Sequence, residues 1–208
     1  MQGEPVSDDA ELFAAWGAGD REAGARLFDR HFAALYRFFR NKVRTGADDL
    51  VQATFLACIE AKQAFRGEGS FRGFLFGVAR NVLGKHYRTL LRRDGRIDPG
   101  VTSLHDLAPG PSELVAQRAE QRLLLAALRR IPLDAQLVLE LYFWESMTAP
   151  EAAAVLDVPE GTVRTRLRRA KQLLTARLAE LAGSRALLHS TLTDLEGWAR
   201  SLREQLAP

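Results

Sequence analysis

Apolar side chains recur every three or four positions through most of the chain, which is the period of an amphipathic helix. Asp20 is suited to cap a helix that carries Leu27, Phe28, Phe32, Leu35, Tyr36 and Phe39. Asp48 opens a second stripe, and a further helix is predicted from about Ser70 to Leu91. No segment alternates between apolar and polar residues as a half-buried strand does. The sequence therefore predicts an all-α fold.

The helical pattern is interrupted over residues 92–112, which contain Gly95, Pro99, Gly100, Pro109, Gly110 and Pro111. This composition is typical of a flexible linker. It divides the chain into a small helical domain at 1–91 and a second at 113–182. In the second domain we expect one helix between Ser112 and Pro132, and further helices at about 134–144, at 149–156 and at 160–182. About 20 fully extended residues can span about 70 Å at most, which is close to the length of two turns of B-DNA. The two halves of the chain could therefore contact DNA sites nearly two turns apart.

Residues 183–208 carry a narrower apolar stripe made of Leu188, Leu192, Leu195, Ala199, Leu202 and Leu206. This spacing predicts a C-terminal helix, and a solitary helix of this length is marginal unless its stripe packs on something. Two interpretations stay open. The extension is either docked on the second domain, or it is a regulatory helix that covers a DNA or polymerase surface or receives a partner.

The composition is that of a soluble globular protein, with 47% hydrophobic and 26% charged residues. No run is long and apolar enough to insert in a membrane, and the N-terminal residues lack the apolar core of a signal peptide, so we expect a cytoplasmic protein. Cys58, the single cysteine, is expected to be a buried thiol. The four histidines are scattered, so neither a metal site, a cofactor nor an enzyme active site is predicted.

The strongest local signal lies between Thr148 and Leu174. Thr148 and Glu151 have the spacing of a capping box, and Asp157 begins a tight turn. Beyond the turn, an inward stripe leaves Thr165, Arg168, Arg169 and Gln172 facing away, flanked by Arg164, Arg166 and Lys171. This pattern is typical of a helix-turn-helix whose second helix enters the major groove, where arginine reads guanine and binds phosphate. The alternative is an ordinary helical hairpin with a basic solvent face.

Sequence segments in both halves of the chain resemble conserved regions of bacterial RNA polymerase sigma factors of the extracytoplasmic-function group. The segment MTAPEAA at 147–153 and the segment PEGTVRTRLRRA at 159–170 resemble region 4. DDLVQATF at 48–55 resembles region 2.2, and FRGFLFGVARN at 71–81 resembles regions 2.3 to 2.4. The resemblance covers residues 10–180 in order. It implies a protein that binds core RNA polymerase, recognises −10 and −35 promoter elements and helps to open the duplex.

The resemblance also implies roles for individual residues. Asp48, Asp49 and Gln52 would bind the clamp of the polymerase largest subunit, and the flap would be a second contact of the polymerase. Recognition of the −35 element would use Thr162, Arg164, Thr165, Arg168 and Arg169. Recognition of the −10 element would use Arg66, Ser70, Phe71, Arg72, Arg80, Asn81, Lys85 and Arg88, with a base pocket at residues 67–70. An anti-sigma protein is the further partner that this resemblance implies.

The segment from Phe65 to Arg88 interleaves rings and cations, as surfaces that bind single-stranded DNA do. Of its rings, we expect at least two to be buried, namely Phe74 and one of Phe71 or Phe76. Three positions depart from the family pattern. Phe74 stands where tryptophan is common, Lys85 where an acid is common, and Gln136 where arginine is common, so that a phosphate contact is lost there.

Two other functions fit parts of the sequence. The first is a DNA-binding regulator that uses the helix-turn-helix without directing initiation, although such a protein needs neither the acidic 48–52 segment nor the ring-rich helix. The second is a sigma-like decoy that has lost promoter opening, which the residues at 85 and 136 keep open.

Overall fold

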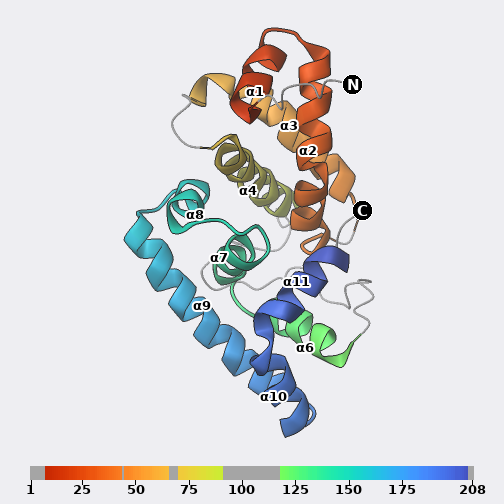
Figure 1. Ribbon diagram of the computed structural model, residues 1–208, viewed down its shortest axis with the longest axis vertical. Helices are drawn as coiled ribbons and strands as arrows, with labels where there is room; N and C mark the ends of the chain where they lie inside the picture. The colour runs from red at the N-terminus through yellow and green to blue at the C-terminus, as the bar shows by residue number, and fades with distance from the viewer. Residues whose placement is uncertain (1–7, 44, 66–69, 91–117, 206–208) are drawn as a thin grey trace, which may run out of the picture.

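The computed structural model describes residues 8–43, 45–65, 70–90 and 118–205 (Figure 1). Within these residues the regular structure is helical throughout, which confirms the predicted all-α class. The elements are α1 (Asp9–Gly17), α2 (Arg21–Arg40), α3 (Ala47–Glu60), the short 3-10 helix η1 (Lys62–Ala64), α4 (Phe71–Leu90), α6 (Ala119–Leu128), α7 (Leu133–Phe143), α8 (Ala149–Leu156), α9 (Glu160–Leu181), α10 (Arg185–Thr193) and α11 (Leu195–Gln205).

The first bundle, α1 to α4, is built on capped helices and a ring-rich core. The Asp20 carboxylate accepts hydrogen bonds from the Glu22 and Ala23 amides at 2.9 and 3.1 Å, as the sequence predicted for the start of α2. The α1–α2 contact is so close that a Cβ on Gly24 would lie 2.5 Å from the Trp16 ring, so this position requires glycine. The core includes fully buried Leu27, Leu35, Phe39, Val51, Cys58 and Phe76. The prediction of a buried thiol at Cys58 is therefore confirmed.

The second bundle consists of α6, α7, α8 and α9. Leu124, Ile131, Val138, Leu141 and Ala170 are among its fully buried side chains. Thr148 caps α8 in a capping box with Glu151, as predicted. Asp157 then adopts the left-handed conformation, with φ 53°, and this lets the chain turn sharply into α9.

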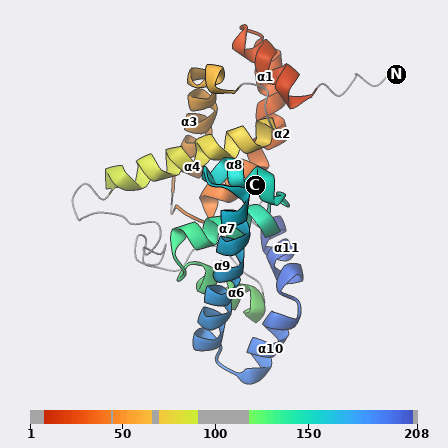
Figure 2. The same cartoon turned by 90° about the vertical axis from the view of Figure 1, so that its left-hand side faces the viewer.

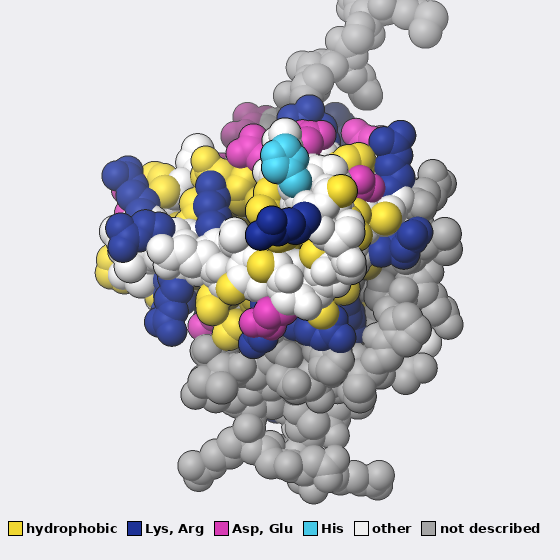
Figure 3. Space-filling view, turned by 90° about the horizontal axis from the view of Figure 1, so that it is seen from below, with side chains coloured by type: hydrophobic (Ala, Val, Ile, Leu, Met, Phe, Trp, Pro, Cys, Tyr) yellow, Lys and Arg dark blue, Asp and Glu magenta, His cyan; other side chains and the backbone are white. Residues whose placement is uncertain are grey.

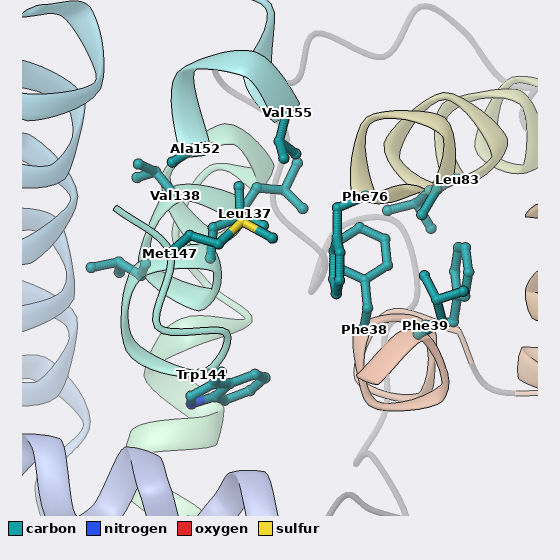
Figure 4. Close-up of a cluster of buried hydrophobic side chains, with 14 of the residues drawn as sticks. Phe38, Phe39, Phe76, Leu83, Leu137, Val138, Trp144, Met147, Ala152 and Val155 are labelled. Carbon is teal, nitrogen blue, oxygen red and sulfur yellow. The ribbon is translucent and has the colours of Figure 1, made fainter. Parts of the chain in front are cut away.

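The two bundles pack directly on each other. Figure 2 shows α4 lying across the top of the second bundle, against α8. Apolar side chains of α2 and α4, among them Phe38 and Phe76, face those of α7, α8 and the connecting loop, among them Leu137, Met147 and Val155 (Figure 4). Polar groups complete the interface, with Lys42 after α2 buried against Glu140 on α7.

The tail differs from the single helix that its stripe predicts. It forms two helices, α10 and α11, that meet at Asp194 and pack mainly on α6. The break has a local cause, because the Asp194 carboxylate accepts a hydrogen bond from the Gly197 amide at 3.1 Å and so caps α11. Leu192, which the predicted stripe would have turned inward, is exposed. The end of the molecule near α10 mixes charges of both signs with apolar side chains (Figure 3).

Candidate DNA and polymerase interfaces

The first half of α9 presents a row of basic and polar side chains to solvent. Arg164, Thr165, Arg168 and Arg169 are exposed, and Thr162 is half-buried at the start of the helix. The opposite face is fixed inward by Val163, Ala170, Leu174 and Leu178, which are buried. The five residues predicted for −35 recognition therefore share one continuous side of the helix, at the outer edge of the molecule (Figure 1).

The turn before α9 holds this helix in a defined orientation. The Thr148 amide donates to the Glu151 carboxylate at 2.8 Å, and the Thr148 hydroxyl donates to the same oxygen at 2.7 Å. These hydrogen bonds lower the pKa of Glu151, because they stabilise its charged form. The capped entry to α8 and the left-handed Asp157 thus form the helix-turn-helix geometry that the sequence predicts.

The start of α3 forms an acidic surface. Asp48, Asp49 and Gln52 are exposed, whereas Leu50 and Phe55 are buried. Leu56 lies one helical turn beyond Gln52 on the same side, and 65% of its surface is exposed. Leu56 was not predicted from the sequence, although its position four residues after Gln52 and outside the buried stripe is a signal that indicates an exposed apolar residue.

A cavity of about 600 Å³ separates part of α4 from α8. From the first bundle, its lining includes Phe65, Ser70, Phe74, Arg80 and Asn81. Lys85 and Arg88 are exposed further along α4. The structure thus brings together most of the predicted −10 residues on one helix, while Arg66 and positions 67–69 of the predicted base pocket lie outside the described residues.

At least two rings of α4 are buried, as predicted, but they are not the expected pair. Phe71 and Phe76 are both buried, at 3% and 0% exposure, and Phe74 is the half-buried ring that lines the cavity. The reason is that Phe71 fills the space beside Phe13, with ring centroids 4.9 Å apart, whereas Phe74 sits at the edge of this ring cluster against Phe65. Phe71, predicted to contact DNA, is therefore a core side chain in this structure.

Two further positions are occupied by contacts between the bundles. The Arg72 guanidinium donates to the Glu145 carboxylate at 2.7 Å and is 30% exposed. Gln136 is fully buried, and its amide donates to Glu140 at 2.6 Å. The sequence predicted that glutamine in place of arginine at position 136 removes a contact with a DNA phosphate. In this structure the Gln136 side chain lies inside the contact between the bundles and out of reach of DNA.

Comparison with known proteins agrees with this architecture. Residues 27–93 match the family model for sigma-70 region 2, and residues 121–174 match that for sigma-70 region 4. The RNA polymerase sigma factor CnrH of Cupriavidus metallidurans is 32% identical over 185 residues, which cover 84% of this chain and 96% of that protein. The ECF sigma factor SigM of Mycobacterium tuberculosis is 31% identical over 183 residues, covering 87% of this chain and 88% of that protein. The chain belongs to the extracytoplasmic-function (ECF) sigma factors.

Solved structures share the fold of this sigma factor. CnrH in complex with the cytosolic domain of CnrY aligns with a TM-score of 0.60 at 27% identity, covering 84% of this chain and 99% of that one. The sigma factor RpoE of Bartonella quintana, solved with the anti-sigma factor NepR, aligns with a TM-score of 0.57 at 21% identity, covering 76% and 98%.

Family membership gives the function in outline. The sigma factor binds core RNA polymerase, recognises promoter DNA and directs transcription initiation. Because the matches include region 2 as well as region 4, a regulator built on the helix-turn-helix alone does not account for the chain. Among the described residues, no helix combines the length and the apolar composition required to cross a membrane.

Proposed function

We propose that three surfaces of the sigma factor divide the work of initiation. The outer side of α9 binds the −35 element in the major groove, the cavity side of α4 holds the −10 strand, and the start of α3 binds the polymerase clamp. The observation that carries the proposal is the exposed basic side of α9, because no fold requirement explains about two consecutive turns of outward polar and basic residues there.

The arginine side chains of α9 support its role in DNA binding. Arg168 and Arg169 are exposed, and neither guanidinium has a carboxylate within salt-bridge distance among the described residues. Such guanidinium groups can bind phosphates or form paired hydrogen bonds with guanine. Arg164 is held by Glu160, one turn before it, at 2.5 Å, which orients its side chain at the start of the helix. The basic side of α9 therefore has one arginine, Arg164, whose side chain is oriented by an ion pair. Arg168 and Arg169 can adopt the side-chain conformation that DNA requires.

For α4, the support is a polar and aromatic lining next to exposed cations. Phe65 and Phe74 offer ring faces on which an extruded base stacks, and Asn81 offers an amide that pairs with a base edge. Lys85 and Arg88 then follow the backbone of the strand. In this proposal Phe71 supports the ring cluster and does not contact DNA.

For α3, the support is an exposed leucine beside exposed acids. An apolar side chain such as Leu56 gains most by entering a pocket on a partner, and the surrounding Asp48, Asp49 and Gln52 supply orientation through polar contacts. We place Leu56 with these three residues in the surface that binds the clamp.

The α9 assignment is tested by measuring DNA affinity as a function of salt for R168A and R169A. Each lost phosphate contact lowers the slope of log affinity against log salt by about 0.9, and a lost base contact weakens sequence preference. The matched control is R177A, which removes the same charge from the same helix at a residue paired with Glu180. If R168A and R169A behave as R177A does, the −35 role of this surface is wrong.

The α3 assignment is tested by binding to core polymerase. L56S and D49N should weaken the complex with core without lowering the unfolding free energy, because both side chains are exposed. E60Q, which changes an exposed carboxylate at the other end of α3, is the control and should bind core as the parent protein does. Equal core affinity in all three variants would remove the clamp role from this surface.

The further partners follow from the relatives. CnrH was solved in complex with the cytosolic domain of CnrY, and the Bartonella sigma factor RpoE was solved with the anti-sigma factor NepR. We propose that this sigma factor also has an anti-sigma partner, that it acts in the cytoplasm with the polymerase, and that it has no catalytic activity of its own. Co-purification of the tagged chain from its own host, with and without core polymerase, tests the first of these.

A further inference from the structure

The first turn of α9 places an acid inside its otherwise basic side. Glu160 is the first residue of the helix, and its carboxylate accepts a hydrogen bond from the Arg164 guanidinium at 2.5 Å. An acid is favourable in the first turn of a helix wherever its side chain points. The helix therefore accounts for the charge of Glu160, but it does not account for the contact with Arg164.

The exposure of this pair limits what it does for stability. The Glu160 side chain is 43% exposed and the Arg164 side chain is 74% exposed. Ion pairs in water contribute little to folding, because solvent screens the charges and two long side chains must be ordered. A carboxylate beside DNA also repels phosphates of every sequence. On a surface that binds DNA, Glu160 therefore lowers affinity unless the contact with Arg164 has a further effect.

The contact restricts the directions in which Arg164 can point. A guanidinium group is planar and carries five N–H donors, so one bond to Glu160 leaves four for a ligand. Arginine recognises guanine by two parallel hydrogen bonds to O6 and N7, which require a defined plane of the group. A side chain that is ordered before binding also loses less entropy when it makes these bonds. Glu160 thus prepares Arg164 to select a base.

The residue between the two leaves the surface open. Gly161 is exposed, and a Cβ at this position would meet nothing within 4 Å, so the fold does not require glycine there. Glycine weakens a helix relative to alanine, but it allows the close approach of a ligand to the backbone. The Thr165 hydroxyl, one turn further on, donates to the Gly161 carbonyl at 3.1 Å and so is turned toward the helix. The edge of a base pair can therefore come close to the side of α9 that carries Arg164.

We propose that Glu160 is a positioning residue for −35 recognition, which fixes the plane of Arg164 against one guanine, while Gly161 leaves the space that DNA needs beside it. This role rests on the proposed −35 function of α9. The first residues of a recognition helix are those that reach base edges in the major groove. Glu160 lowers affinity for all DNA and raises the preference for guanine at a single base pair.

The test measures sequence preference and affinity separately. The full chain, in complex with core polymerase, binds double-stranded DNA with a randomised upstream segment, and the bound molecules are sequenced. The parent is compared with E160Q, R164A and the double variant E160Q/R164A. Affinity of the full chain for a duplex without the selected element is measured for the same proteins. E180Q is the matched control, because it removes the same charge from an exposed ion pair with Arg177 at the other end of α9.

The two readouts should move in opposite directions in E160Q. R164A should lower the preference for guanine at one base pair by about 5- to 150-fold, the contribution of a paired arginine–guanine contact. E160Q should lower the preference at the same base pair about two- to fivefold, as loss of an exposed ion pair does. Its affinity for the duplex without the element should rise about twofold, because a repulsion is removed. E160Q/R164A should show the preference of R164A alone, and E180Q that of the parent.

G161A tests the open surface next to the pair. The variant should unfold at a higher urea concentration than the parent, because alanine favours a helix, and yet bind the selected element less tightly, because its methyl group occupies the space. A stabilised variant that binds less DNA cannot be explained by misfolding. Affinity equal to that of the parent would show that DNA does not approach this turn closely, and the proposal would be wrong.

Other results overturn the proposal and differ in what else they remove. If E160Q keeps the parent's preference at the base pair that R164A affects, Glu160 does not position Arg164, while the −35 role of α9 stands. If E160Q changes the preference equally with and without Arg164, Glu160 acts on DNA directly and is not a positioning residue. If R164A leaves the preference at every base pair unchanged, the positioning role and the assignment of Arg164 to −35 recognition are both wrong.

Discussion

Replacing Lys42 by methionine tests whether the ion pair between the regions is buried in solution. The lysine is fully buried, and burial lowers its pKa, with the Glu140 carboxylate acting in the opposite direction. Methionine has a similar length and keeps the apolar contact with the Phe38 ring, which the Lys42 ammonium group approaches to 4.1 Å from the ring centroid. K42M therefore removes the charge and the hydrogen bond to the Phe38 carbonyl, and it leaves Glu140 with its amide donors from Asn41 and Gln136.

The expected loss follows from the burial of both partners. Removing one member of a buried ion pair costs about 3–5 kcal/mol, because the remaining charge is left without its counter-charge. We therefore expect K42M to lower the unfolding free energy by about 3–4 kcal/mol at pH 7.

Urea unfolding followed by circular dichroism and tryptophan fluorescence measures this difference. The double variant K42M/E140Q removes both charges and keeps an oxygen that accepts from Asn41 and Gln136, so it should recover most of the lost stability. A loss below about 1 kcal/mol in K42M would refute the reasoning, because that is the size of effect that exposed ion pairs give. It would mean that the two regions are separated in solution.

Three smaller perturbations test local features. T148A removes the cap shared with Glu151 and should cost about 1 kcal/mol of unfolding free energy in a urea titration. His31 contacts Asp9 at 2.7 Å, and its pKa is lowered chiefly by burial. Because the folded state disfavours the charged imidazole, the unfolding free energy should fall as the pH drops below about 6.5. H31Q should remove this fall, as measured by urea unfolding between pH 7 and 5. D194A removes the cap of α11 and should lower the thermal midpoint by an amount that corresponds to about 1 kcal/mol, whereas an unchanged midpoint would show that the tail is not packed.

Local signals in the sequence predicted those parts of the fold that local physics decides. Asp20 and Thr148 cap the helices that their positions predicted, because a capping side chain needs only the amides two or three residues away. The inward stripe of α9 was predictable for a similar reason, since Val163, Ala170 and Leu174 recur with the helical period. The exposed basic side of α9 follows from that stripe.

The contact between the regions could not be predicted in this way. Asn41 and Lys42 lie 99 and 98 residues before Glu140, and nothing in a charged side chain's neighbours along the chain indicates a buried partner that far away. The sequence predicted a buried Phe74 and only one buried ring of Phe71 and Phe76, because the phenylalanines of α4 cannot be distinguished by their sequence neighbours. Which ring faces the cavity depends on Phe13 from α1.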